Sequence, residues 1–274
     1  MLVSSTTTMR LSSSLFKIPI INNILFYDTI GSTNDKAKEL ARRNSVHGSL
    51  VVAKSQTAGK GRLGRSFYST SDDGLYFSLL LRPNVEPSHL SGITLVAALA
   101  LSEAIDEYCK VKTTIKWPND IYLNGKKILG ILTEAGPDYV VLGIGINVNT
   151  PTFNPDITKT ASSLFLETGL SYDKAELLNI ILCKLNSLYE SFVSHKDLSF
   201  MQAEYNSSLA GLNKEVYIIP QNVTLNIANP SDIDLANLDS YICLGIDITG
   251  NLKCQDSFGT IHYVNSGEVS LRTK

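Results

Sequence analysis

The stretch from Thr113 to Val148 constrains the fold of this chain more than any other part of the sequence. It contains four apolar runs, which read "TTIKW", "IYL", "ILGILTE" and "YVVLGIGINV". Asn124-Gly125 separates the second run from the third, and Asn-Gly between apolar runs is a strong signal for a tight β-hairpin. Gly136-Pro137-Asp138 predicts another turn before the last run. The stretch therefore predicts an antiparallel meander instead of strands that alternate with helices.

Upstream of the meander, apolar runs predict strands at residues 24–27, 50–53 and 75–81. A short helix is expected after the first strand, because Ser32 can cap it and Asp35 stands three residues later, as in a capping box. A second helix is expected from Pro87 to about Tyr108, since its apolar residues recur every three or four positions.

Downstream, the same periodicity predicts a long helix from residue 171 to about 193 and a short one at residues 200–205. After Gly211 the pattern changes, and short apolar runs between turn residues predict strands at 216–219, 223–227, 242–246, 261–264 and 269–271. The expected fold class is α+β. A mixed, largely antiparallel sheet flanked by helices would occupy residues 24–210, and a small all-β domain would occupy residues 211–274.

Residues 1–23 differ from the rest of the chain in composition. They are rich in Ser and Thr, carry Arg10 and Lys17, and contain no acidic residue. Such a segment is typical of a disordered leader, and an organellar transit peptide is the other interpretation. We therefore expect no folded domain before Ile24, and a cytoplasmic protein unless the leader directs import.

Charge and cysteine patterns exclude several classes of partner. A net charge of −2 and a pI of about 6.1 provide no overall attraction to nucleic acid or to an anionic membrane. The four cysteines form no C-x-x-C pair, and the four histidines show no zinc-binding spacing. The best apolar run near the N-terminus is interrupted, so we expect no transmembrane helix. Any binding of anions must then depend on local clusters of cations.

One such cluster is "GKGRLGR", Gly59 to Arg65, which spells G-x-G-x-x-G. A dinucleotide-binding turn requires a helix directly after the glycines, but "SFYSTSDDG" follows, and its residues disfavour a helix. Two interpretations remain, a solvated basic loop and a flexible loop that wraps an anion with Lys60, Arg62 and Arg65. In the second, the glycines serve mobility and close approach of the backbone to a ligand.

A second motif is "KWPND", Lys116 to Asp120, which contains the single tryptophan of the chain. In isolation, Trp117 could be a core residue and the remainder a turn. However, "GSTN", "QTAGKGRLGR", "KWPND", "KKILGILTE" and "GIGINVN", in this order, resemble the motifs of biotin protein ligases, the biotin–[acetyl-CoA-carboxylase] ligases and holocarboxylase synthetases. The resemblance extends from about Ile24 to the C-terminus, which is similar to the small SH3-like C-terminal domain of that family. Two departures are Lys60, where the family loop usually has Arg, and the lack of an N-terminal helix-turn-helix domain.

This resemblance implies a biotin/lipoate ligase fold and a two-step reaction. ATP and biotin would form biotinyl-5′-AMP with Mg²⁺ as activator, and the biotinyl group would pass to a lysine on the carrier domain of a carboxylase. The enzyme would be a monomer or a homodimer. The residues that match catalytic positions are Lys127, Arg62 and Asp120, and Asp120 is also the candidate Mg²⁺ ligand. Those that match biotin-binding positions are Ser32, Thr33, Asn34, Gln56, Lys60, Gly61, Arg62 and Lys127. Those that match ATP- or adenylate-binding positions are Gly59, Arg62, Arg65, Lys116, Trp117, Asn119, Asp120 and Asn147.

The chemistry explains why these residue types are needed. A carboxylate that approaches a polyphosphate is repelled unless cations such as Arg62 and Lys127 neutralise the charge. Lys126 is not expected at the site, because adjacent residues of a strand point to opposite faces. In the second step a carboxylate, Asp120, could orient the acceptor amine and accept its proton.

Two alternatives remain open. A lipoate–protein ligase of the same broad fold would activate a similar acid. A non-enzymatic nucleic-acid-binding module would use the loop cations on phosphates, although the negative net charge argues against it.

Overall fold

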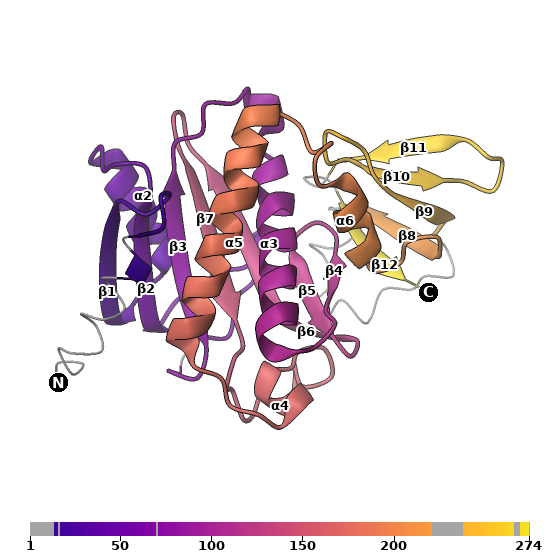
Figure 1. Ribbon diagram of the computed structural model, residues 1–274. Helices are drawn as coiled ribbons and strands as arrows, with labels where there is room; N and C mark the ends of the chain where they lie inside the picture. Colours follow the sequence, from indigo (N-terminus) through magenta and orange to yellow (C-terminus); the bar gives the residue numbers. More distant parts are fainter. Residues whose placement is uncertain (1–13, 16, 70, 221–237, 266–268, 274) are drawn as a thin grey trace.

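The computed structural model describes residues 14–15, 17–69, 71–220, 238–265 and 269–273 (Figure 1). The main sheet has seven strands in the order β1-β2-β3-β7-β6-β5-β4. Their bounds are β1 (Asn23–Ile30), β2 (Ser49–Gln56), β3 (Leu75–Leu81), β4 (Thr114–Lys116), β5 (Asp120–Leu123), β6 (Lys126–Ala135) and β7 (Val140–Ile146). Only the β1–β2 pair is parallel among these neighbours. The predicted mixed, largely antiparallel sheet is therefore confirmed.

The antiparallel meander is also confirmed, because β4, β5, β6 and β7 are consecutive neighbours in the sheet. Asn124 and Gly125 join β5 to β6 with φ angles of 50° and 81°. A tight hairpin of type I′ needs a positive φ at both central residues, which Asn and Gly adopt at little cost.

Helices cover both faces of this sheet (Figure 1). α3 (Gly92–Cys109) and α5 (Lys174–His195) lie side by side on one face, and α2 (Thr33–Arg42) packs on the other. Alternation along β2 explains the two layers, since Leu50 and Val52 belong to the large core while Val51 packs with α2. The short helices are α4 (Leu164–Thr168) and α6 (Gln202–Ser208).

One expectation about the helices is wrong. Ser32 occupies the N-cap position of α2 but makes no capping hydrogen bond with its side chain, so the capping box does not form. The segment Pro87–Cys109 is long and apolar enough for a membrane span by length and composition. However, 67% of its apolar window is buried within the protein, as is usual for the core helix of a compact fold.

The C-terminal strands form a second, all-β sheet, as predicted. Its order is β11-β10-β9-β8-β12, with β8 (Glu215–Pro220), β9 (Ser240–Ile246), β10 (Leu252–Gln255), β11 (Ile261–Val264) and β12 (Val269–Thr273). Strand β10 was not predicted, and the strand predicted at 223–227 lies outside the described residues. The division at residue 211 stays a prediction, because one buried cluster includes residues from both sides of it, such as Leu209 and Val216.

Part of the predicted leader is folded. Leu15, Ile18, Ile20 and Ile21 are each at most 5% exposed and belong to the large core. The Ile20 amide donates a hydrogen bond of 2.8 Å to Oδ1 of Asn186 on α5. The expectation of disorder is therefore wrong for these residues, because their apolar side chains cover the core. Residues 1–13 lie outside the described residues.

Candidate active site

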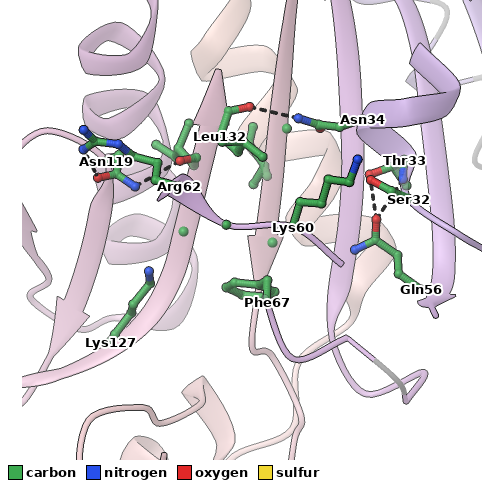
Figure 2. A pocket seen from close by; sticks show the side chains of 16 residues that line it. Ser32, Thr33, Asn34, Gln56, Lys60, Arg62, Phe67, Asn119, Lys127 and Leu132 are labelled. Carbon is green, nitrogen blue, oxygen red and sulfur yellow. Dashed lines mark hydrogen bonds between the residues drawn. The ribbon is translucent and has the colours of Figure 1, made fainter. Parts of the chain in front are cut away.

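A cavity, here called cavity A, lies where the start of α2, the glycine-basic loop (residues 59–65) and strands β6 and β7 meet (Figure 2). All eight residues predicted to bind biotin line it. Its other lining residues are Phe67, Asn119, Gly130, Ile131, Leu132, Gly143, Ile144 and Gly145. The motifs that are scattered along the sequence are thus gathered at one place.

A second cavity, cavity B, adjoins the first. It is lined by Arg62, Arg65, Ser66, Phe67, Tyr68, Lys116, Trp117, Pro118, Asn119, Asp120, Tyr122, Lys127, Asn147, Phe153, Ile157, Thr160 and Ala161. Of the residues predicted to bind ATP, only Gly59 lines neither of the two cavities. Four residues line both, namely Arg62, Phe67, Asn119 and Lys127. The two cavities therefore share a wall that carries two cations.

Polar groups at the α2 end of cavity A are held by hydrogen bonds between α2, β2 and β3 (Figure 2). Oε1 of Gln56 accepts from the Thr33 amide at 2.8 Å and from Thr33 Oγ1 at 3.1 Å. Ser78 Oγ lies 2.8 Å from Thr33 Oγ1. Because Oε1 of Gln56 faces Thr33, its amide nitrogen is left to donate elsewhere.

Asn34 has a defined orientation in the same cluster. Its Nδ2 donates to the carbonyl oxygen of Leu132 at 3.2 Å and to Oε2 of Glu134 at 2.8 Å. Its Oδ1 accepts from Ser78 Oγ at 2.6 Å. Both amide hydrogens are used, so Asn34 can offer a ligand only the remaining lone pair of Oδ1.

Glycines on β6 and β7 make room for these side chains. A Cβ on Gly143 would lie 1.9 Å from Oδ1 of Asn34, and one on Gly145 would lie 2.6 Å from the Phe67 ring. Gly130 pairs with Gly145 across the two strands, and a Cβ on Gly130 would lie 3.2 Å from Lys127 Nζ. The strand glycines therefore allow the side chains of Asn34, Phe67 and Lys127 to lie close to the sheet.

The glycine-basic loop forms a small hairpin of its own. The Gly61 amide donates to the Arg65 carbonyl at 2.7 Å, and the Phe67 amide donates to the Gly59 carbonyl at 3.0 Å. A single 3₁₀ turn, Arg62–Gly64, is followed by strand β3, so the exclusion of a dinucleotide-binding turn is confirmed.

Mobility alone does not account for the loop glycines. A Cβ on Gly59 would lie 2.2 Å from Ser69 Oγ, and Gly64 has a φ of 74°. Gly59 therefore serves packing of the loop base, and Gly64 serves the turn.

Four side chains form a connected network at the shared wall. Lys127 Nζ lies 2.7 Å from Oδ1 of Asp120, and Asn119 Nδ2 donates to the same oxygen at 3.0 Å. Arg62 Nη1 donates to Oδ1 of Asn119 at 2.9 Å. Burial lowers the pKa of Arg62 from its ordinary value, and the Asp120 charge opposes this effect. Arg62 stays a cation at neutral pH, because a guanidinium does not lose its proton in proteins.

Lys127 faces the cavities and Lys126 lines neither, as alternation along the strand predicted. Lys60 lines cavity A, but its Nζ contacts Oδ1 of Asp35 at 2.7 Å. In Figure 2 the amines of Lys60 and Lys127 lie on opposite sides of the cavity. The predicted contact of Lys60 with a carboxylate ligand would therefore require that this ion pair open.

Asn147 and Trp117 differ in what they can offer to cavity B. Nδ2 of Asn147 donates to the Ser162 carbonyl at 3.0 Å, whereas its Oδ1 is buried and has no hydrogen-bond partner among the residues that the structure describes. Trp117 is 2% exposed, and its Nε1 donates to the Gly250 carbonyl at 3.2 Å. Asn147 thus presents an unused acceptor, while the indole N–H of Trp117 joins the main sheet to the C-terminal sheet.

The residues present do not form a ready-made metal site. No group of three or more His, Cys, Asp or Glu side chains is placed to hold an ion within the part of the chain that the structure describes. Asp120 is the one carboxylate that lines cavity B, and it is paired with Lys127. Mg²⁺ commonly binds through one or two carboxylates together with substrate phosphates, so Asp120 fits a metal that arrives with a nucleotide.

Sequence reasoning missed several residues of this site. Phe67 and Ser78 lie outside the motifs used, although Phe67 lines both cavities and Ser78 holds Asn34. Ser78 could have been found as the single polar residue of the apolar run "LYFSLLL". Glu134 also holds Asn34, and its place at the end of the motif "KKILGILTE" was a signal that was not used.

Comparisons with known proteins agree with this arrangement. Residues 26–150 match the family described as "Biotin/lipoate A/B protein ligase family". The bifunctional ligase/repressor BirA of Bacillus subtilis is 41% identical over 180 residues, which are 63% of this chain and 55% of that protein. A biotin–[acetyl-CoA-carboxylase] ligase of Mycobacterium tuberculosis is 36% identical over 146 residues, 52% of this chain and 54% of the relative. The chain spans about half the length of these curated relatives.

A solved structure matches over a longer range. The biotin protein ligase of Aquifex aeolicus in complex with biotin and ATP superimposes with a TM-score of 0.79 and 30% identity. The match covers 93% of this chain and 100% of that one. Since the fold, the motifs and the full length of a known structure agree, the chain belongs to the biotin/lipoate A/B protein ligase family.

Proposed function

We propose that this protein is a biotin protein ligase, which activates biotin with ATP and transfers the biotinyl group to a lysine of a carboxylase carrier domain. The observation that carries the proposal is the wall shared by cavities A and B. Lys127 and Arg62 stand at that wall, where an acid in one cavity would meet a nucleotide in the other. The Aquifex aeolicus relative was solved with both biotin and ATP, which supports the same pair of substrates here.

Cavity A suits an acid with a polar ring at one end. A cyclic urea has two N–H donors and one carbonyl acceptor. Asn34 can only accept, and Gln56 has an amide nitrogen left to donate, so both kinds of partner are present at the α2 end. Ile131, Leu132 and Ile144 line the cavity as well, and they suit an apolar chain between the ring and the carboxylate.

Cavity B suits a nucleotide. Arg65 and Lys116 provide positive charge for phosphates. The unused Oδ1 of Asn147 fits an amino group, such as the exocyclic amine of adenine. A buried acceptor without a partner costs free energy, so filling it would favour a base that carries a donor there.

In the first step, a carboxylate oxygen of biotin forms a bond to the α-phosphorus of ATP, and the bond from that phosphorus to the pyrophosphate oxygen breaks. Two anions must approach one another. Lys127 and Arg62 would neutralise the charge on the carboxylate and the α-phosphate. Mg²⁺ would neutralise further phosphate charge, with Asp120 as the residue available to hold it.

In the second step, the acceptor amine bonds to the acyl carbon and AMP leaves with its phosphate oxygen. The amine must first be neutral, although an ordinary lysine has a pKa of about 10.4. Asp120 would accept the proton that the amine loses. The ion pair with Lys127 must loosen for this role, which binding of the anionic substrates to Lys127 would bring about.

The test is incubation of the full chain with ATP, Mg²⁺ and either biotin or lipoate, followed by mass spectrometry of a biotin carboxyl-carrier domain and of a lipoyl domain. We expect biotin transfer to the carboxyl-carrier domain and none with Lys127→Ala. Lipoyl transfer without biotin transfer would instead support the lipoate ligase. Absence of both acyl-adenylates would contradict either assignment.

A further inference from the structure

Four charged side chains form a chain of ion pairs along one side of cavity A. Lys60 Nζ, on the glycine-basic loop, lies 2.7 Å from Oδ1 of Asp35. Lys38 Nζ lies 3.1 Å from the same oxygen and 2.7 Å from Oε1 of Glu134. The signs alternate, and the four residues come from the loop, from α2 and from β6. The loop is thereby connected electrostatically to the body of the protein.

The same chain of contacts reaches into cavity A. The second oxygen of Glu134, Oε2, accepts from Nδ2 of Asn34 at 2.8 Å. The Glu134 carboxylate therefore orients the Asn34 amide through Oε2 and pairs with Lys38 through Oε1. Asn34 and Asp35 are adjacent on the first turn of α2, so the polar end of the cavity and the loop anchor share one rigid element.

The loop has a second anchor on the opposite side of the cavity. Arg62 Nη1 donates to Oδ1 of Asn119 at 2.9 Å. Lys60 and Ser66 form an antiparallel bridge that closes the base of the loop. A hairpin that is closed by its own backbone moves as a unit, so its position over the cavity depends on the contacts at its two sides.

Two groups of this chain of ion pairs, Asp35 and Lys38, are favoured in their charged forms by their neighbours. Partial burial acts to raise the pKa of Asp35, but hydrogen bonds from Lys60 and Lys38 outweigh it, and the net shift is downward. Burial acts to lower the pKa of Lys38, but Glu134 and Asp35 outweigh it, and the net shift is upward.

We propose that Asp35 is a positioning residue, which holds the glycine-basic loop across cavity A through Lys60 before any substrate binds. This inference rests on the proposed function only where it assigns cavity A to the acid. It also gives a reason for lysine at position 60. Lys60 contacts a single carboxylate oxygen of Asp35, for which one ammonium group on a flexible side chain is sufficient. The parallel N–H donors of an arginine would not both be used there.

Proteolysis of the ligand-free full chain tests this role, because Arg62 and Arg65 lie within the loop. An arginine-specific protease cuts there only when the loop leaves its place. Asp35→Asn should raise the rate of cleavage after Arg62 and Arg65 about two- to fivefold, the range expected for one exposed ion pair. Asp35→Glu keeps the charge and should be cleaved at nearly the wild-type rate.

The matched control is Asp28→Asn, which removes the ion pair of 2.7 Å between Asp28 and Lys54. That pair is similarly exposed, at 58% and 39%, and joins β1 to β2 without a residue of the loop. The control should leave cleavage unchanged. In 1 M NaCl the difference between Asp35→Asn and wild type should shrink, because exposed charges are screened.

Equal cleavage of wild type and Asp35→Asn, or equal acceleration by Asp28→Asn, would overturn the proposal. The protease measurement needs neither biotin nor ATP, so it stays readable if the ligase assignment fails. In the active enzyme, Asp35→Asn should raise the KM for biotin by a similar factor and leave kcat for adenylate formation unchanged. A fall in kcat alone would also contradict a positioning role.

Discussion

Lys127 and Asp120 form an ion pair across the β5–β6 hairpin, with 2.7 Å between Nζ and Oδ1. In the proposed reaction Lys127 acts in the first step, and Asp120 accepts the proton of the amine in the second. Their side chains are 29% and 21% exposed, so the pair is partly shielded from solvent. Binding of an anionic substrate to Lys127 would weaken this ion pair and leave Asp120 able to accept a proton. The first step would therefore prepare Asp120 for the second.

Lys127→Ala should abolish adenylate formation, with a loss of at least about a hundredfold, because a fixed charge at the reacting atoms is removed. Stability should change by no more than about 1 kcal/mol, since the lost ion pair is partly exposed. Pyrophosphate release measures the first effect, and urea denaturation the second. Lys126→Ala, one residue away and outside both cavities, is the matched control and should be fully active. Normal adenylate synthesis by Lys127→Ala would contradict the assigned role.

Asp120→Asn should separate the two steps. Adenylate should still form, because Lys127 and Arg62 remain, whereas transfer to the carrier lysine should slow by about a hundredfold or more. Single-turnover measurements with preformed biotinyl-adenylate isolate this second step. If both steps slow equally, Asp120 acts on the nucleotide or its metal and not on the amine.

Arg62→Gly should accelerate release of the adenylate by roughly tenfold or more, because a charge-assisted contact to the phosphate is lost. The same change breaks the hydrogen bond to Asn119 that anchors the loop. Arg62→Lys keeps the charge without the fork and should give an intermediate rate. If Arg62→Gly releases activated biotin at the wild-type rate, the loop does not retain the adenylate.

Gly143→Ala should weaken biotin binding by roughly tenfold, because the new methyl group would displace Asn34 from its three partners. Calorimetric titration measures the affinity. Gly31→Ala is the control, since a Cβ there meets no atom within 4 Å. Equal affinities of the two variants would show that the Asn34 amide does not contact the ligand.

His47 should make stability fall in mild acid. Burial lowers the pKa of His47 from its ordinary 6.5, and Nδ1 accepts from the Arg82 amide at 3.0 Å, which requires an unprotonated nitrogen. The unfolded chain therefore takes up a proton near pH 6.5, before the folded one does. The stabilising contribution is complete above that pH and is lost as the pH falls through the folded-state value. Chemical denaturation from pH 7.5 to 5 should show this slope, and His47→Gln should flatten it.

The residues that the sequence motifs predicted for biotin binding lie together in the structure. All eight residues expected at the biotin site line cavity A, and the Asn124-Gly125 turn set the meander that brings Lys127 to it. Local rules were sufficient here, because a hairpin turn and strand alternation depend on residues close in the chain.

The same local rules failed where a residue could contact either its neighbours in the chain or a distant part of the fold. Ser32 matches a capping position, yet its side chain makes no capping bond. Residues 1–23 resemble a leader in composition, yet the apolar side chains of Leu15, Ile18, Ile20 and Ile21 lie in the core. Neither outcome can be predicted without knowing which parts of the fold pack against these residues.

Sequence alone thus predicted the antiparallel meander, the residues that line cavity A from the family motifs, and the presence of a basic loop. Tertiary structure decided that Lys60 pairs with Asp35, that Glu134 orients Asn34, and that Lys127 neutralises Asp120. These contacts join residues that are up to 100 positions apart. Charge attraction acts through space over a few ångströms, and only the register of the sheet and the packing of α2 bring such groups within that range.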